Sequence, residues 1–131
     1  MRYLIDTHTF LWFSNGDQAL SQKAKNVILD ANNTIFISIA SLWEISIKMA
    51  LGKLSIASNY ADIIDDVTGN NIAILPINFA HTVQQNQLPL HHRDPFDRII
   101  IAQAIVENLH ILGKDVIFDD YLNEMPIKRI W

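Results

Sequence analysis

Residues 90–98 read Leu-His-His-Arg-Asp-Pro-Phe-Asp-Arg and run directly into the apolar segment 99–104, Ile-Ile-Ile-Ala-Gln-Ala. Asp94 before Pro95 predicts the start of a helix, because proline fits the first helical position and aspartate accepts a bond from an unpaired N–H group. Asp97 then occupies the third helical position, where the helix dipole favours a negative charge. It also shares a helix face with the apolar residues four and seven positions later, which should pack in the core. A carboxylate beside the core is costly without a partner, so the stretch predicts a metal or catalytic site at the helix start.

Three further acidic residues stand where apolar segments would bring them to one place. Asp6 ends a short apolar strand predicted at 3–5, and Asp115 closely follows another at 111–112. Glu44 lies inside an apolar helical pattern. The carboxyl ends of strands form the functional edge of open α/β sheets. We therefore expect four carboxylates to converge there: Asp6, Glu44, Asp97 and Asp115.

These motifs resemble those of PIN-domain proteins, specifically the VapC-type toxins of type II toxin–antitoxin modules. The resemblance covers essentially the whole chain, and the run from His92 to Arg98 is its most specific part. The other matching segments are 4–8 (LIDTH), 41–48 (SLWEISIK), 88–91 (LPLH), 101–104 (IAQA), 114–115 (KD) and 130–131 (IW).

The resemblance implies that the four acids Asp6, Glu44, Asp97 and Asp115 form a metal site for Mg²⁺ or Mn²⁺. It also implies an endoribonuclease that acts on RNA, forms a homodimer and is silenced by a small antitoxin encoded alongside. One departure is Gly113, where many relatives have Thr or Ser. The departure removes a hydroxyl that could have contacted substrate or metal-bound water near the fourth acidic position, for which Asp119 is the alternative to Asp115.

Alternating strand and helix patterns predict an α/β fold with a central parallel sheet of about four or five strands and helices on both faces. We expect one domain spanning residues 1–131, with Ser41 capping the helix that carries Glu44. Strands are predicted at 3–5, 34–38, 72–75, 111–112 and 127–131. Helices are predicted at 9–13, from 21 to about 31, and at 41–52, 59–67, 78–83, 95–108 and 116–121.

Composition limits the functional classes. The chain has no cysteine, which excludes disulfides and thiolate metal sites and fits an intracellular, cytoplasmic location. No signal peptide and no membrane-spanning segment are expected. The net charge of −4 comes from 10 basic and 14 acidic residues, so without the four site acids the balance is 10 minus 10, or zero. That balance suits a metal-dependent nuclease better than a protein that holds nucleic acid by charge alone.

Clustered carboxylates raise one another's pKa and become useful when a hard divalent cation binds among them. Such a cation can activate water and stabilise charge on a phosphodiester. We expect Asp6 and Asp97 to be direct ligands, with Glu44 and Asp115 binding directly or through water. No serine or threonine has an evident His/Asp partner for nucleophilic catalysis, and no Gly-rich phosphate loop is present.

Residues around the acids are candidates for substrate contact. Arg98 could bind a phosphate or brace a site carboxylate, Thr7 and His8 would lie at the sheet edge, and Lys48 could instead pair with Glu44 four positions earlier. His91 and His92 are expected in loop structure or substrate contact rather than as ligands. The tryptophans are interpreted as core residues rather than base-stacking platforms: Trp12, Trp43 and Trp131.

Three other functions remain open. The first is a housekeeping PIN-type nuclease without an antitoxin. The second is a receiver-type signalling domain that binds Mg²⁺, although the strands ending at Ser38 and Leu75 lack the acceptor aspartate such a domain needs. The third is a binding module that keeps the fold without activity, against which the presence of all four acids argues.

Overall fold

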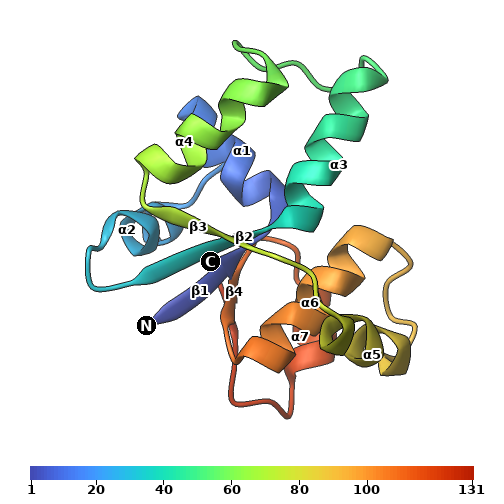
Figure 1. Ribbon diagram of the computed structural model, residues 1–131. Helices are drawn as coiled ribbons and strands as arrows, with labels where there is room; N and C mark the ends of the chain where they lie inside the picture. Colours follow the sequence, from blue (N-terminus) through green and yellow to red (C-terminus); the bar gives the residue numbers. More distant parts are fainter.

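The structure, a computed structural model, describes residues 1–131 and contains one five-stranded parallel sheet. Its strand order is β3-β2-β1-β4-β5, which places β1 at the centre (Figure 1). All four strand pairings are parallel, so the predicted parallel α/β fold is confirmed. The strands are β1 (Arg2–Ile5), β2 (Thr34–Ser38), β3 (Ile72–Leu75), β4 (His110–Leu112) and β5 (Arg129–Ile130).

Helices cover both faces of this sheet, as the sequence predicted. In Figure 1, α1, α3 and α4 lie on one side and α5, α6 and α7 on the other. The helices are α1 (Thr7–Asn15), α2 (Gln22–Leu29), α3 (Ile39–Ala50), α4 (Ile63–Gly69), α5 (Phe79–Gln87), α6 (Pro95–Glu107) and α7 (Ile117–Leu122), with a short 3₁₀ turn, η1 (Tyr60–Asp62), before α4. None of them has the length and apolar character needed to cross a membrane.

The core is divided by the sheet into two apolar clusters, because successive side chains of a strand point to opposite faces. Tyr3 and Ile5 of β1 pack into a cluster with residues of α1, α2, α3 and α4. Leu4, between them, packs instead with α6 and α7. Burial on both faces explains why the central strands are almost continuously apolar.

Strand register brings three chain segments to one edge of the sheet. Ile5 pairs with Ile37 of β2 and with Leu112 of β4. The Asp6 N–H also donates to the carbonyl oxygen of Leu112 at 3.2 Å. Asp6, the start of α3 and the segment after β4 therefore lie together at the carboxyl ends of β1, β2 and β4.

The predicted cap of the helix carrying Glu44 is wrong. The hydroxyl of Ser38, the last residue of β2, accepts the Ala40 N–H at 3.0 Å, so α3 begins at Ile39. Ser41 lies buried inside the helix, and its hydroxyl has no hydrogen-bond partner. The strand passes into the helix without a loop, and a serine at that junction is as good a cap as one three residues later.

The ends of several elements also differ from prediction. Helix α5 continues to Gln87 rather than 83, and β5 is limited to Arg129–Ile130. The central helix α6 ends at Glu107, where Asn108 adopts a left-handed conformation (φ 57°) and closes the helix.

Candidate metal centre

Asp6 lies at the carboxyl end of β1 and caps α1. Its Oδ1 accepts the N–H of Thr9 at 2.9 Å, and the residue is only 6% exposed. Burial raises the pKa of Asp6, and the nearby charge of Asp115 raises it further. The hydrogen bonds from Thr9 and the proximity of His8 act in the opposite direction. Asp6 is thus a carboxylate whose negative charge the metal-free protein disfavours.

Asp94 and Asp97 lie in the first turn of α6, where the sequence predicted them. Asp94 Oδ1 accepts the Phe96 N–H at 2.9 Å, which confirms the predicted cap. Burial raises the pKa of Asp97 to about 6, with further contributions from the charges of Asp94 and Asp6, while His92 opposes the shift. The charge of Asp6 at the end of β1 is thus near enough to act on Asp97 in the first turn of α6.

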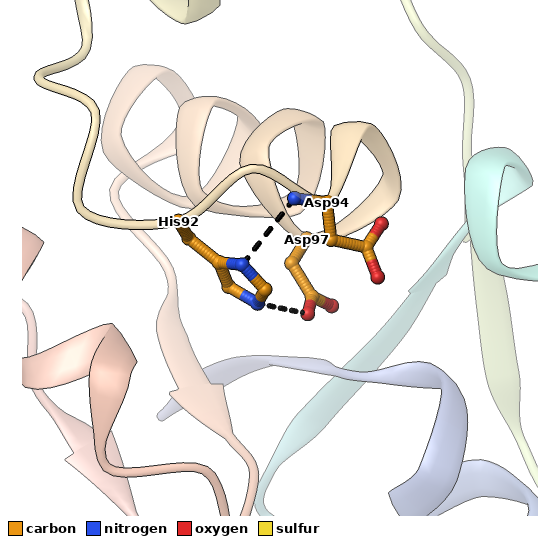
Figure 2. A group of neighbouring side chains, drawn as sticks. All are labelled: His92, Asp94 and Asp97. Atoms are coloured by element: carbon orange, nitrogen blue, oxygen red, sulfur yellow. Dashed lines mark hydrogen bonds and ion pairs between the residues drawn. The ribbon is translucent and has the colours of Figure 1, made fainter.

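His92 holds Asp97 from the loop before α6 (Figure 2). Its Nε2 lies 2.8 Å from Asp97 Oδ2, and its Nδ1 accepts the Asp94 N–H at 3.3 Å. Because Nδ1 is an acceptor, a neutral His92 carries its proton on Nε2 and donates it to Asp97. The Asp94 carboxylate points away from the ring in Figure 2.

This arrangement was not predicted from the sequence, where His92 was expected to be a loop or substrate residue and Asp94 a cap alone. Ligand atoms of His92, Asp94 and Asp97 all lie within 4.8 Å of one another. The sequence did contain a signal for this group, because all three residues lie within six positions at a helix start. The loop before the helix folds back over its first turn and brings His92 against Asp97.

Asp115 lies in the segment after β4, near Asp6, but of the four predicted acids only Asp97 belongs to a group of ligand atoms within 4.8 Å of one another. Asp115 Oδ1 accepts the Ile117 N–H at 3.0 Å, and the Asp115 charge acts on Asp6. The alternative, Asp119, has both carboxylate oxygens bound to Arg129, each at 3.0 Å. Asp119 is therefore engaged in an ion pair with β5, and Asp115 remains our candidate for the fourth position.

Four aspartates share one property: one carboxylate oxygen of each accepts a hydrogen bond within the protein, and the other accepts none. They are Asp6, Asp94, Asp97 and Asp115. Gly113 contributes the space for one of these free oxygens. A Cβ atom at position 113 would lie 3.0 Å from Asp6 Oδ2 and 3.2 Å from Phe118 Cε2. The glycine that departs from the family pattern thus makes room for the Asp6 carboxylate.

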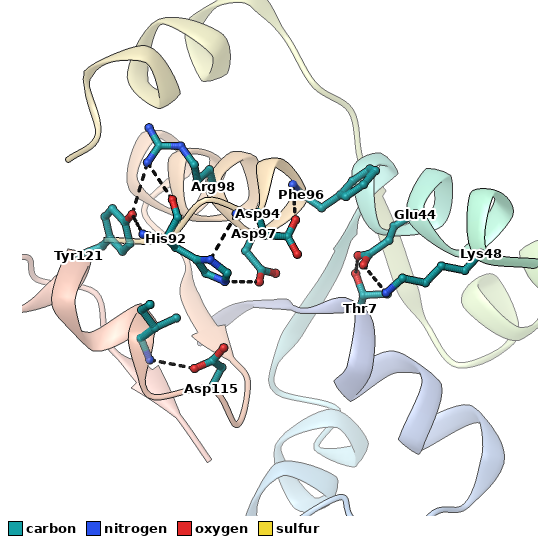
Figure 3. Close-up of polar contacts among 11 residues, drawn as sticks. Thr7, Glu44, Lys48, His92, Asp94, Phe96, Asp97, Arg98, Asp115 and Tyr121 are labelled. Atoms are coloured by element: carbon teal, nitrogen blue, oxygen red, sulfur yellow. Dashed lines mark hydrogen bonds and ion pairs between the residues drawn. The ribbon is translucent and has the colours of Figure 1, made fainter. Parts of the chain in front are cut away.

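Glu44 is bound differently from the aspartates. It is 5% exposed, its Oε1 accepts the Thr7 hydroxyl at 2.7 Å, and its Oε2 lies 2.7 Å from Lys48 Nζ. Figure 3 shows this group on one side of Asp94 and Asp97, with Asp115 on the other. Thr7 and Lys48 therefore contact the acidic site through Glu44, and the Glu44–Lys48 pair is the one that the spacing of four suggested.

The structure contradicts a direct substrate role for Arg98. The side chain is 6% exposed and donates to the carbonyl oxygens of Gln85, Leu88, Pro89 and His92 and to the Tyr121 hydroxyl, at 2.9–3.4 Å. It makes no hydrogen bond or ion pair with a site carboxylate, because its donors are bound to these carbonyl oxygens and the Tyr121 hydroxyl. The Arg98 side chain leaves α6 toward the inside of the preceding loop and donates hydrogen bonds to the carbonyl groups there.

The interpretation of the tryptophans as core residues is wrong for Trp43, which is 61% exposed. Its ring packs edge-on against Phe96 at a centroid distance of 5.5 Å. Trp12 and Trp131 are partly buried, and their ring centroids lie 5.8 Å apart. His91 is exposed and packs against Tyr121 at 5.0 Å.

The donor set fits a hard divalent cation. Carboxylate oxygens are the ligands that Mg²⁺ and Mn²⁺ prefer, and a cation would offset the burial and the like charges that raise the pKa values of Asp6 and Asp97. Asp6, Asp97 and Asp115 offer free oxygens for this purpose, and Asp94 offers another. Both oxygens of Glu44 are already hydrogen-bonded, so Glu44 could bind the cation directly only by giving up its bond to Thr7 or to Lys48.

Three solved structures share the fold over nearly the whole chain. VapBC2 from Rickettsia felis bound to a promoter DNA fragment has a TM-score of 0.71 at 18% identity, covering 99% of this chain and 98% of that one. DNA-bound VapBC from Salmonella typhimurium has a TM-score of 0.67 at 14% identity, covering 99% and 97%. VapBC-1 from nontypeable Haemophilus influenzae has a TM-score of 0.62 at 18% identity, covering 99% and 97%.

A search of the curated proteins finds no match to this chain. The family model of the PIN domain, in contrast, matches residues 3–122. That span contains all the carboxylates described above. The chain therefore belongs to the PIN-domain family.

Proposed function

We propose that this protein is a divalent-metal-dependent endoribonuclease and the VapC-type toxin of a type II toxin–antitoxin pair. The observation that supports the proposal is the electrostatic influence of Asp115 on Asp6 and of Asp6 on Asp97, in a PIN domain where each of the three has one carboxylate oxygen free of hydrogen bonds. Membership of this family removes the receiver-type alternative. The exposed position of Asp115 beside buried Asp6 leaves the site open to a polymer substrate.

The reaction is hydrolysis of an RNA phosphodiester. A water oxygen forms a bond to phosphorus, the bond from phosphorus to one ribose oxygen breaks, and that oxygen takes up a proton. Bound Mg²⁺ or Mn²⁺ would supply an activated water and stabilise charge on the phosphate. Asp6 and Asp97 would hold the cation, and Asp115 and Glu44 would bind it directly or through water.

The chain's other residues keep these acids in place. His92 orients Asp97 through Nε2, and Thr7 and Lys48 orient the two oxygens of Glu44. Lys48 remains partly exposed and is also our candidate for contact with an RNA phosphate. Thr7 is buried, so any contact with substrate would be through the Glu44 carboxylate that it holds.

The central test uses purified protein and an end-labelled single-stranded RNA. We expect cleavage with Mg²⁺ or Mn²⁺, no cleavage with EDTA, and no cleavage by Asp6→Asn or Asp97→Asn protein that keeps its circular dichroism spectrum. Full activity of folded Asp97→Asn protein would overturn the assignment. RNA that stays intact with either metal would support the inactive binding module.

The proposed partner is a small antitoxin, and the proposed place of action is the cytoplasm. Three structural neighbours are VapBC complexes, which supports an antitoxin without identifying it. An arginine of the antitoxin could pair with the site carboxylates. Exposed apolar side chains such as Phe79 and Leu90 could pack against an antitoxin helix.

Expression of the chain alone should arrest growth, and coexpression with the adjacent small gene should relieve the arrest. The purified product of that gene should inhibit RNA cleavage at a 1:1 ratio. If no adjacent product binds, or binding leaves cleavage unchanged, the housekeeping nuclease becomes the better assignment.

We also propose a homodimer. Twelve large hydrophobic side chains are exposed, and two of them, Ile39 and Trp43 on α3, are not among those assigned above to the antitoxin. Burial of such side chains against a second copy would be favourable. Sedimentation at tens of micromolar should therefore give about twice the chain mass of 15.0 kDa, and a monomer would contradict the proposal.

A further inference from the structure

Trp12 is the centre of a cluster that combines aromatic rings with a basic side chain. The ring centroid of His8 lies 5.7 Å from that of Trp12, and the centroid of Trp131 lies 5.8 Å away. The ammonium nitrogen of Lys114 lies 5.8 Å from the Trp12 centroid, above the ring. His8 and Lys114 are exposed, whereas both tryptophans are partly buried. The cluster thus combines two packed tryptophan rings with two side chains, His8 and Lys114, that are accessible to a ligand.

This cluster adjoins the acidic site. His8 stands two residues after Asp6 and is close enough to lower its pKa. Lys114 directly precedes Asp115, whose charge also reaches Asp6. A polymer whose phosphate lies between Asp6 and Asp115 would therefore have its neighbouring nucleotide near Trp12.

Lys114 makes no ion pair, in contrast to two other basic residues near the site. Lys48 is bound to Glu44, and Arg129 is bound to Asp119. Arg98 is buried among carbonyl groups. Lys114 has no carboxylate partner among the ion pairs of the structure, and its only described contact is with Trp12. Its charge is therefore available to a phosphate.

We propose that His8, Trp12 and Lys114 form a nucleotide subsite for single-stranded RNA beside the acidic centre. Lys114 pairs with a backbone phosphate, and the rings of Trp12 and His8 pack against the adjacent base. Single-stranded nucleic acid is commonly bound by this combination of cations and aromatic rings, because unpaired bases expose their faces. The inference rests on the ribonuclease function proposed above and specifies which residues bind the strand.

The packing of Trp12 on Trp131 alone has a simpler explanation, since it anchors the end of the chain. That explanation does not require a lysine above the ring or an exposed histidine beside it. It predicts that substitution of Lys114 leaves RNA binding unchanged, and this difference can be measured.

The test compares steady-state cleavage of a single-stranded RNA by the wild type, Lys114→Gln, Lys114→Arg and Lys25→Gln. Lys25 is exposed on α2, so its substitution is a charge-matched control. We expect Lys114→Gln to raise KM about tenfold, the effect of one lost charged hydrogen bond, with kcat little changed. We expect the slope of log kcat/KM against log salt to become shallower by about 0.7. Lys114→Arg should restore both values, and Lys25→Gln should match the wild type.

Trp12 is tested with Trp12→Phe and Trp12→Leu, each checked by thermal unfolding. The phenylalanine variant should keep most of the binding and the leucine variant should lose it, because only an aromatic ring offers a stacking face. If Trp12→Leu does not fold, the Lys114 comparison still decides. A loss that is equal for single-stranded and duplex RNA would overturn the role of the rings.

The outcomes separate the two proposals. If the wild type cleaves RNA and Lys114→Gln behaves as Lys25→Gln does, the subsite is wrong and the nuclease assignment stands. If Lys114→Gln weakens antitoxin binding but leaves KM for RNA unchanged, the cluster is a protein-binding surface and the subsite is likewise wrong. If the wild type neither binds nor cleaves RNA with Mg²⁺ or Mn²⁺, the nuclease function and the subsite fail together.

Discussion

His92 Nε2 lies 2.8 Å from Asp97 Oδ2, while the other ring nitrogen of His92 accepts the Asp94 N–H. One imidazole therefore connects the loop before α6 to both acids of its first turn. The contact holds one oxygen of Asp97 and leaves the other without a hydrogen bond. The Asp97 carboxyl is nevertheless unfavourable when charged, because burial and the charges of Asp94 and Asp6 raise its pKa to about 6.

Asp97 should make the metal-free protein less stable as pH rises. Its pKa in the folded state, about 6, lies above the ordinary aspartate value of 3.8, so its stabilising contribution is fully present below pH 3.8 and is lost as pH rises through 6. The effect is at most about 3 kcal/mol, because a tenfold change in a proton-binding constant corresponds to about 1.4 kcal/mol. Asp97→Asn should therefore gain stability over the wild type between pH 4.5 and 7.5, measured by urea unfolding in EDTA.

Asp62→Asn provides the control for this comparison. Asp62 is exposed and makes no side-chain capping bond. Its substitution should give a difference from the wild type that varies much less with pH. If the free energies of unfolding of Asp97→Asn and the wild type change in parallel with pH, the folded protein does not raise the pKa of Asp97, and the prediction is wrong.

Metal binding should reverse this pH effect. Mg²⁺ or Mn²⁺ stabilises the folded state by about 2.7 kcal/mol at a concentration of 100 Kd, provided that the unfolded chain does not bind it. The metal-induced rise in melting temperature should be larger at pH 7.5 than at pH 5.5. Below about pH 6 a proton on the Asp97 carboxyl competes with the metal for the same oxygens. Differential scanning fluorimetry measures both shifts. Asp6→Asn should remove most of the metal effect, and an unchanged shift in that variant would exclude Asp6 as a ligand.

Gly113→Ala should displace the Asp6 carboxylate. The added Cβ would lie 3.0 Å from Asp6 Oδ2 and 3.2 Å from Phe118 Cε2, closer than ordinary contact on both sides. We expect a loss of about 1–3 kcal/mol in stability, as for overpacked sites, together with weaker metal binding. Isothermal titration with Mn²⁺ and urea unfolding measure the two effects.

Gly69→Ala is the matched control, since no atom lies within 4 Å of a Cβ at that position. Gly69 is the last residue of α4, far along the chain from every site acid. The alanine should be neutral or slightly stabilising and should leave metal binding unchanged. Wild-type metal affinity in Gly113→Ala would mean that Asp6 moves freely without loss of its ligand role.

Tyr121→Phe should loosen the loop that carries His92. The Tyr121 hydroxyl accepts the His92 N–H at 2.7 Å and an Arg98 N–H at 3.3 Å. Without it, buried donors lose a partner at a cost of about 1–3 kcal/mol. We expect a lower melting temperature and a lower kcat with KM little changed, because the position of Asp97 depends on His92. A fall in stability with unchanged kcat would limit Tyr121 to a structural role.

Much of the fold could be predicted from the sequence because its signals are local. Asp94 before Pro95 defines the start of α6 through groups within one helical turn, and the structure has the same cap. The apolar runs at 34–38 and 72–75 became strands with those bounds, since parallel strands buried on both faces need continuous apolar sequence. The alternation of these runs with helices was sufficient to predict a parallel sheet.

The tertiary structure decided which partner each polar side chain has. Arg98 could not be distinguished from a phosphate-binding arginine until the loop carbonyls that surround it were in place. Thr7 and Glu44 bond across 37 positions of sequence, and His92 reaches Asp97 only because the loop folds back over the helix start. Spacing along a chain determines which face of an element a residue occupies. The path of loops and the packing of elements determine what that face meets, and these depend on contacts that no local pattern contains.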